Sequence, residues 1–184
     1  MFEFAKKLMF AKHLNIEKGA LTILNHRFMI VPAKTFATLV KYDIPDVNKS
    51  LYTAAKESGK LYADALTKKF GAKGQKLEGL MIDTFNLSGW GLLEILKNNF
   101  QKKVAVFHIN NSSVAMEYGK SKKPICHTNR GFLAGGACMV HGSDVECLET
   151  KCSAAGNSFC EYVTGPINYL KDKYPDIVKT QIRS

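Results

Sequence analysis

The sequence predicts a mixed α/β (α+β) domain in which a mostly antiparallel sheet packs against long helices. Two observations lead to this prediction. Apolar and small residues recur at helical spacing through residues 46–70 and 125–141, whereas short runs rich in β-branched and aromatic residues follow one another in pairs at 19–31 and 145–163. A chain of 184 residues, 46% of them hydrophobic, has the size of one domain with a substantial core.

The N-terminal part, residues 1–45, is expected to form a helix and a hairpin that precede the main body. Its β-rich runs meet at Asn25-His26, which reads as a turn, and Pro32 ends the second run. The predicted elements, in order, are a helix over 2–14, strands over 19–25 and 27–31, and a helix over 33–42.

The remaining residues, 46–184, are expected to alternate helices with strand pairs, and Asp46 is placed to favour the N-terminal dipole of the first helix. Gly135 and Gly136 lie in the middle of a predicted helix, where each glycine costs about 1 kcal/mol, so close contact with another backbone should compensate. The tail after Pro175 is expected to fray. The predicted elements are helices over 46–70, 77–100 (interrupted near Ser88-Gly89), 125–141 and 166–174, and strands over 104–109, 114–118, 145–149 and 159–163.

Three cysteines and one glutamate near the C-terminus form the most informative motif. Glu149, Cys152 and Cys160 follow the spacing E-x2-C-x7-C, and Cys126 precedes the glutamate by 23 residues. Thiolate sulfur and carboxylate oxygen are zinc ligands, and four of them complete a tetrahedral site. The predicted hairpin brings Cys152 and Cys160 together at its turn, and Cys126 stands where a helix starts. A closed site of this kind would hold the fold together rather than activate water.

Other interpretations of the cysteines remain open from the residues alone. Buried cysteine often behaves as a small hydrophobic residue, and Cys138 and Cys147 are both expected to pack in the core. Disulfides are disfavoured, because the chain has five cysteines and its first 14 residues are broken by charge too often for a secretory signal. No run reaches the roughly 18 apolar residues that span a membrane. We therefore expect a cytoplasmic protein with reduced thiols.

The chain carries a formal net charge of +10 at neutral pH. Lysines and arginines are spread over several predicted helices without a nucleic-acid-binding motif, so nucleic acid is not an expected partner. Four basic residues flank the candidate metal ligands and are placed to offset the negative charge of three thiolates and a carboxylate on a divalent ion. They are Lys122, Lys123, Arg130 and Lys151.

Four segments of the C-terminal half together resemble the 4-vinyl reductase domain family. They are Pro124–Cys126, the glycine-rich helix through Gly135-Gly136, Val145–Cys152 and Gly156–Val163. The clearest match covers residues 104–164, within a 4-vinyl reductase-type domain expected over 46–184. The resemblance implies a ligand-binding fold shared with aromatic-sensing transcription activators, Golgi-transport (TRAPP) subunits and nitric-oxide-signalling haem domains. It also implies a zinc ion held by Cys126, Glu149, Cys152 and Cys160.

The resemblance further implies a pocket for a small apolar molecule between the long helices and the sheet, often within a homodimer. Seven apolar residues are candidates for its wall, although each would also suit a plain core. They are Tyr62, Leu66, Phe85, Trp90, Leu93, Phe107 and Phe132.

The residues do not support the reductase activity in the family name, because no dinucleotide-binding glycine motif, P-loop or other cofactor motif is present. The leading hypothesis is a stand-alone zinc-containing binding domain, sensory or regulatory, for a hydrocarbon, aromatic or tetrapyrrole-like ligand. It predicts a closed, apolar, ligand-sized pocket. One alternative is a protein-interaction adaptor, with a filled core and an exposed apolar patch. The other is a vinyl-group reductase with an external electron donor and an open cleft.

Overall fold

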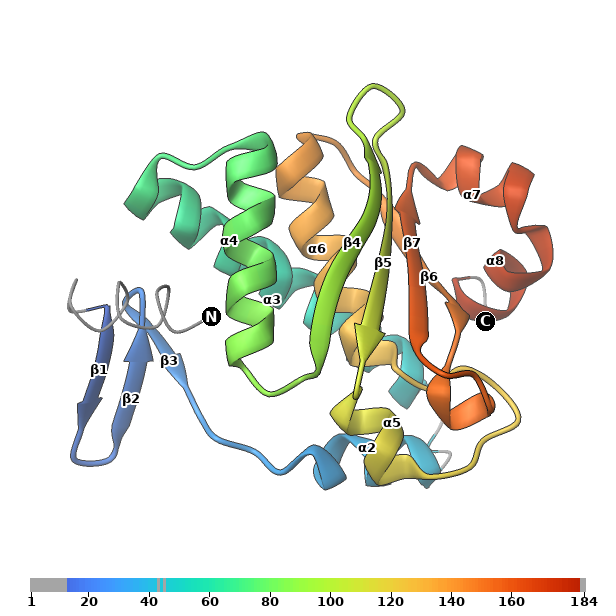
Figure 1. Cartoon of the computed structure of the whole chain (residues 1–184). Coiled ribbons are helices and arrows are strands. Elements are labelled where there is room, and N and C mark those ends of the chain that lie inside the picture. Colours follow the sequence, from blue (N-terminus) through green and yellow to red (C-terminus); the bar gives the residue numbers. More distant parts are fainter. Residues whose placement is uncertain (1–12, 43, 45, 183–184) are drawn as a thin grey trace.

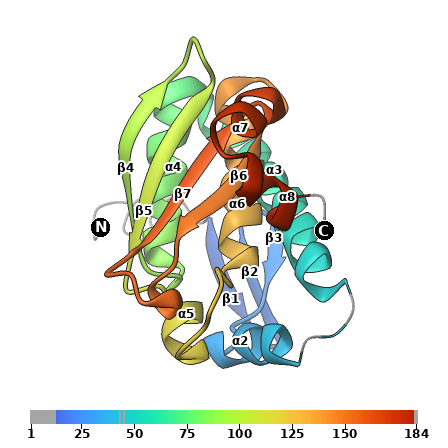
Figure 2. The ribbon, with the colours of Figure 1, turned by 90° about the vertical axis from the view of Figure 1, so that its right-hand side faces the viewer.

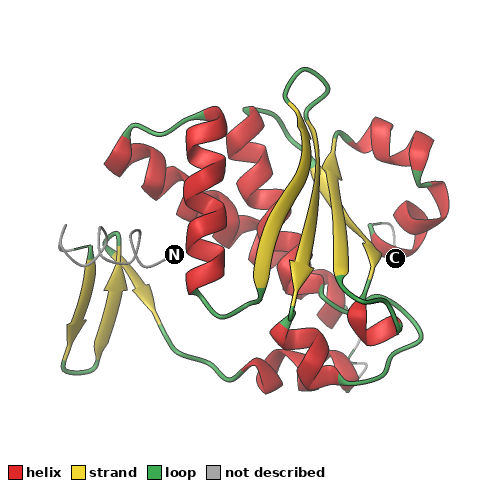
Figure 3. Ribbon diagram, viewed as in Figure 1, coloured by secondary structure: helices red, strands yellow, loops and turns green. Residues whose placement is uncertain are grey.

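The computed structural model of the chain describes residues 13–42, 44 and 46–182, and it confirms the mixed α/β fold (Figure 1). Within these ranges, seven helices accompany two antiparallel sheets (Figure 3). The helix predicted over 2–14 falls mostly on residues outside the description, and its last residue, Leu14, begins a strand instead. None of the helices in the described ranges combines the length and apolar character that crossing a membrane requires.

A small three-stranded sheet stands at one side of the molecule (Figure 1). It consists of β1 (Leu14–Glu17), β2 (Ala20–Ile23) and β3 (His26–Phe28), paired in that order. Leu24 and Asn25 both adopt positive φ angles, 51° and 65°, as a two-residue hairpin turn demands, and asparagine tolerates that conformation well. The predicted hairpin is therefore present, and β1 extends it by a strand that the sequence did not indicate.

The main sheet has the order β4-β5-β7-β6, with every neighbouring pair antiparallel. Its strands are β4 (Leu92–Asn99), β5 (Val104–Asn110), β6 (Glu146–Lys151) and β7 (Cys160–Gly165). Helices α4 (Gly74–Leu87) and α6 (His127–His141) cover one face, and α3 (Val47–Phe70) lies beyond α6 (Figures 1 and 2). Helices α7 (Ile167–Lys173) and α8 (Pro175–Gln181) pack on the opposite face over β6 and β7 (Figure 2).

Three predicted elements were wrong. The helix expected over 77–100 ends at Leu87, because Gly89 and Gly91 adopt φ angles of +79° and +134°, and the residues that follow pair with β5 as strand β4. The strand expected over 114–118 is helix α5 (Ser113–Tyr118), in which adjacent residues Val114 and Ala115 are both buried, unlike in a strand with one exposed face. The tail after Pro175 does not fray.

The tail forms α8, which Pro175 opens at the first helical turn, a position where its missing N–H costs nothing. Val178 of this helix is 2% exposed and joins a core cluster with Leu148, Val163 and Leu170. Buried apolar contact therefore fixes the C-terminal segment to the sheet. The short helix predicted over 33–42 is confirmed as α2 (Ala33–Lys41).

Helices α3 and α6 approach each other backbone to backbone. A Cβ atom added at Gly135 would lie 2.0 Å from the carbonyl oxygen of Lys56, and one at Gly131 would lie 2.2 Å from that of Tyr52. From the other side, a Cβ at Gly59 would lie 2.4 Å from the carbonyl oxygen of Phe132. The sequence-based expectation of close contact at Gly135 is confirmed, and the absence of side chains at these positions is what allows the two helices to touch.

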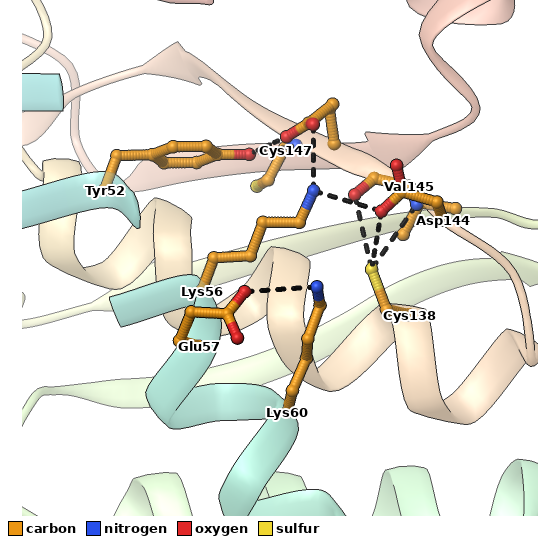
Figure 4. Close-up of polar contacts among 9 residues, drawn as sticks. Tyr52, Lys56, Glu57, Lys60, Cys138, Asp144, Val145 and Cys147 are labelled. Atoms are coloured by element: carbon orange, nitrogen blue, oxygen red, sulfur yellow. Dashed lines mark hydrogen bonds and ion pairs between the residues drawn. The ribbon is translucent and has the colours of Figure 1, made fainter. Parts of the chain in front are cut away.

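A polar network fixes α3 to the start of β6 (Figure 4). The Lys56 ammonium lies 2.8 Å from Oε1 of Glu146 and 3.2 Å from Oδ1 of Asp144, and the Tyr52 hydroxyl donates to Glu146. Cys138 Sγ lies beside Asp144, at 3.5 Å from its Oδ1. Both Cys138 and Cys147 are buried, as the sequence indicated.

Candidate metal centre and ligand cavity

Cys126, Glu149, Cys152 and Cys160 come together in the structure. One ligand atom from each lies within 4.8 Å of those of the others. Cys126 is the N-cap of α6, Glu149 lies in β6, Cys152 follows that strand, and Cys160 begins β7. The Sγ atoms of Cys126 and Cys160 are 4.0 Å apart. Tetrahedral zinc with Zn–S bonds of about 2.3 Å separates its sulfur ligands by about 3.8 Å, so this spacing fits the ion.

The loop between β6 and β7 shapes the cluster. Its 3-10 turn (Ser153–Ala155) ends at Gly156, whose φ of 96° lets the chain reverse. The carbonyl oxygen of Cys152 accepts hydrogen bonds from the backbone N–H groups of Ala155 and Asn157 and from the Asn157 side chain. The backbone N–H and the hydroxyl of Ser153 lie 3.3 and 3.4 Å from Cys160 Sγ. These donors are suited to a thiolate, because hydrogen bonds to the charged form favour it.

The cluster holds more acid groups than it can ionise without a cation. All three cysteines are fully buried and Glu149 is 2% exposed. Hydrogen bonds from Cys126 and Cys152 lower the pKa of Cys160 to about 2. Burial, followed by repulsion from Cys160, raises the pKa of Glu149 to about 8. One anion thus suppresses the ionisation of its neighbour, which a bound divalent ion would reverse.

Glu149 provides the test of whether a metal fits. Its Oε2 accepts a hydrogen bond from the backbone N–H of Cys126 at 2.9 Å. Its Oε1 is buried and has no hydrogen-bond partner among the described residues. A buried acceptor without a partner costs about 1–3 kcal/mol, so such an atom calls for an explanation. Coordination of a zinc ion together with the three sulfurs supplies one, and the four residues fit the group.

The backbone of Glu149 is held by the C-terminal helix. Gln181 of α8 accepts from the Glu149 N–H at 2.9 Å and donates to its carbonyl at 2.8 Å. Arg130, one turn into α6, donates to the backbone oxygen of Gln181 at 2.7 Å and to its side chain at 3.0 Å. Arg130 is 2% exposed and stacks on the Tyr52 ring. Sequence reasoning named Arg130 only as a flanking charge and missed Gln181, because no local pattern links α8 to this strand.

The other basic residues expected to offset the charge of the cluster lie elsewhere. Lys122 and Lys123 are exposed, and Lys151 pairs with Glu161 at 3.1 Å. Arg130 is therefore the member of that set which is buried near the strand that carries Glu149.

A small cavity of about 30 Å³ lies between α4, α6 and the strands β4 and β5. Three of the predicted wall residues, Leu93, Phe107 and Phe132, line it. The other four pack nearby. Tyr62 and Leu66 of α3 join a core cluster with residues of α4 and α6. Phe85 contacts the Phe132 ring, and Trp90 packs on Phe36. The full lining is Glu78, Met81, Ile82, Leu93, Phe107, Phe132, Leu133, Gly136, Ala137, Val140 and His141. In this conformation the cavity has room for one or two groups the size of water.

Two titratable residues in this wall were not singled out from the sequence. Glu78 is 8% exposed, burial raises its pKa, and its Oε1 accepts from the Asn98 amide at 2.5 Å. Burial also lowers the pKa of His141, and both of its ring nitrogens are buried without a partner in the described part of the chain. The available signal was an acid in the apolar stripe of a helix: Glu78 stands four residues before Ile82 and next to buried Leu77.

An open groove of about 380 Å³ runs along the same helix and the edge strand β4. Glu78 lines both the groove and the smaller cavity, so this residue lies where the two adjoin. The other groove residues are Gln75, Ile95, Leu96, Lys97, Asn98 and Phe100.

Comparison with known families finds a match within the C-terminal half of the chain. Residues 105–166 match the family model of the 4-vinyl reductase domain, so the resemblance read from the sequence is confirmed for this part of the chain. Among curated proteins, none matches the chain significantly.

Solved structures extend the likeness beyond those residues. The phenol-responsive sensory domain of the transcription activator PoxR, with phenol, superposes with a TM-score of 0.78 at 15% identity, over 94% of this chain and 92% of that domain. A vinyl-4-reductase family protein from Methanocaldococcus jannaschii gives 0.55 at 19% identity, over 76% and 84%. A trafficking protein particle complex subunit 3 from Naegleria fowleri, covalently bound to palmitic acid, gives 0.55 at 18% identity, over 72% and 91%. The predicted fold type is therefore confirmed.

Proposed function

We propose that this chain is a zinc-containing binding domain for a small hydrophobic ligand and that it serves sensing or regulation in the cytoplasm. The observation that carries the proposal is the double role of α6. Its N-cap, Cys126, belongs to the buried four-ligand cluster, and its later residues from Phe132 to His141 line a mostly apolar cavity. One rigid element thus connects a structural centre with a binding site.

Zinc in this proposal is structural. The four ligands Cys126, Glu149, Cys152 and Cys160 complete the tetrahedral shell and leave no open position for water. The ion would tie the start of α6 to the β6–β7 turn and neutralise the acid groups of the cluster. Residues 1–184 would form one domain in which 1–45 precede the 4-vinyl reductase-type part.

The similar structures support an apolar ligand. The PoxR domain was determined with phenol, and the trafficking subunit carries palmitic acid. Both ligands are largely apolar, as is the cavity wall here. We infer a ligand of the hydrocarbon, aromatic or tetrapyrrole-like class, and the size of the present cavity means that side chains must move to admit it.

A second candidate, a protein-interaction adaptor, is favoured by one observation. Met29 and Ile30, in the segment that joins β3 to α2, are 81% and 92% exposed, and neighbouring Phe28 is 39% exposed. Large apolar side chains exposed in a row suit burial against another protein. For an adaptor the partner would be another protein, whereas the homodimer that the family resemblance implies belongs to the binding-domain proposal.

Native mass spectrometry with metal analysis of the same sample tests both candidates. The binding-domain proposal predicts one zinc per chain together with a co-purified organic mass. Metal-free protein that is fully folded would refute the zinc part. Zinc without any organic mass, in a sample that carries a partner protein, would favour the adaptor.

A further inference from the structure

Glu78 is a buried carboxyl group that has no cationic partner within the part of the chain that the structure describes. The sequence contains 26 lysines and arginines against 16 acidic residues, yet none of them forms an ion pair with Glu78 among the described residues. The partner that it does have is the neutral Asn98 amide. Burial raises the pKa of Glu78, because an ionised carboxyl group is costly in the interior unless it is paired. A cationic ligand in the cavity would supply the counter-charge that the described protein groups do not.

The cavity has a polar end and an apolar end. Glu78 lies near the start of α4 and His141 is the last residue of α6. Phe100 lies close to both helix ends. The centre of its ring is 5.2 Å from that of His141, and its ring edge would lie 4.0 Å from a Cβ atom added at Gly74, the first residue of α4. Further along both helices the wall consists of Ile82, Phe132 and Leu133. A ligand that fills this space therefore needs an apolar body and one polar head.

The polar end is rich in acceptors. The Glu78 carboxylate accepts, and a neutral imidazole at His141 adds one acceptor nitrogen and one N–H donor, both buried and unpaired within the described ranges. An ammonium head offers three N–H donors and a positive charge, whereas a hydroxyl offers one donor and no charge. Charge-assisted hydrogen bonds are about twice as strong as neutral ones.

On the basis of the proposed binding function, we propose that the cavity selects apolar amines, with Glu78 as the residue that recognises the ammonium head. The apolar body extends toward Leu93 and Phe132. Met81 can make room for this body, because its unbranched side chain repacks readily. Its terminal methyl now lies against Gly136, only 2.9 Å from where a Cβ atom added there would stand.

Three probes of nearly equal shape test the selection: toluene, benzyl alcohol and benzylamine, which is protonated at neutral pH. Binding is measured by titration calorimetry on the purified full chain. The variant Glu78→Gln keeps the shape and the acceptor for Asn98 but removes the charge. Glu94→Gln is the matched control, because Glu94 lies on β4 away from the cavity wall and its bond to Asn110 can be kept.

We expect benzylamine to bind more tightly than the two neutral probes. Glu78→Gln should weaken benzylamine at least about tenfold while leaving the neutral probes within about twofold, and Glu94→Gln should change none of them. Equal affinity for benzylamine and benzyl alcohol in the unmodified chain would refute the amine selection and leave the binding function intact. If none of the three probes binds, both the proposed binding of single-ring ligands and the selection of amines are refuted.

Discussion

Replacing Gly135 with alanine should destabilise the protein, although alanine favours helices over glycine by about 1 kcal/mol. The new Cβ would lie 2.0 Å from the Lys56 carbonyl oxygen and 2.8 Å from the Lys60 backbone nitrogen. Carbon and oxygen need about 3.3 Å, so α3 and α6 must separate by roughly 1 Å. Because both neighbours are backbone atoms, no side chain can yield. Overpacking typically costs about 1–3 kcal/mol, and we expect a net loss of about 2 kcal/mol.

Gly79 provides the matched control. It lies inside α4, its surface is exposed, and an added Cβ would meet nothing within 4 Å. Gly79→Ala should therefore stabilise the chain by up to about 1 kcal/mol, because only the helix propensity changes. Glycine-to-alanine substitution is thus predicted to change the free energy of unfolding in opposite directions at these two helical positions.

Urea unfolding followed by circular dichroism measures both free energies of unfolding, and equal slopes for the variants would show that only stability changed. If Gly135→Ala were as stable as the unmodified chain, the close approach of α3 and α6 would be refuted. If Gly79→Ala also lost stability, the loss at Gly135 could not be assigned to the helix contact.

The remaining predictions concern the metal cluster and its support. Cys152→Ser should lower the zinc content and the melting temperature together, because metal-binding energy in such sites is folding energy. Cys138→Ala should keep its zinc, since that thiol lies beside Asp144 outside the cluster; loss of zinc there would mean that the ligand set is misassigned. Acidification should release zinc, because its ligands bind in their deprotonated forms and protons compete for them as the pH falls. A dye that binds free zinc measures the release. Zinc that stays bound in acid would contradict ligation by thiolates. Gln181→Ala should cost about 1–3 kcal/mol in urea unfolding, because the backbone N–H and carbonyl of Glu149 lose the Gln181 side chain as their partner. Lys179→Ala, an exposed change in the same helix, should cost less than about 0.5 kcal/mol.

The elements that sequence predicted well have local causes. Helix α3 follows from the helical spacing of its apolar residues, and the β6–β7 hairpin follows from Gly156-Asn157 between two β-rich runs. Strand β4 was missed because Leu92 to Leu96 contains apolar residues compatible with either helix or strand. What decides between them is pairing with β5, including the irregularity between Ile95 and Lys97, and this lies in tertiary structure.

The candidate site, too, could be predicted from the sequence only in part. The four candidate metal ligands could be named from two close spacings, a helix start and the family resemblance, and the structure brings their ligand atoms together. The supporting residues could not, because Arg130, Gln181 and Glu149 meet only after α8 packs on the sheet. Glu78 was overlooked for a different reason: an acid at one position of a helix is ordinary until burial shows that the side chain faces a cavity.

The two sides of the cavity wall differ in how easily they can move. Helix α6 is held in place, because Gly131 and Gly135 allow it to pack directly against the α3 backbone and its N-cap, Cys126, belongs to the four-residue cluster. The opposite wall has fewer backbone contacts: α4 contributes side chains such as Met81, and β4 is an edge strand that pairs with β5 alone within the described ranges. Because packed backbones resist displacement more than side chains do, enlargement of the cavity should fall on α4 and β4. A ligand that enlarges the cavity would thus displace the edge of the sheet beside the open groove.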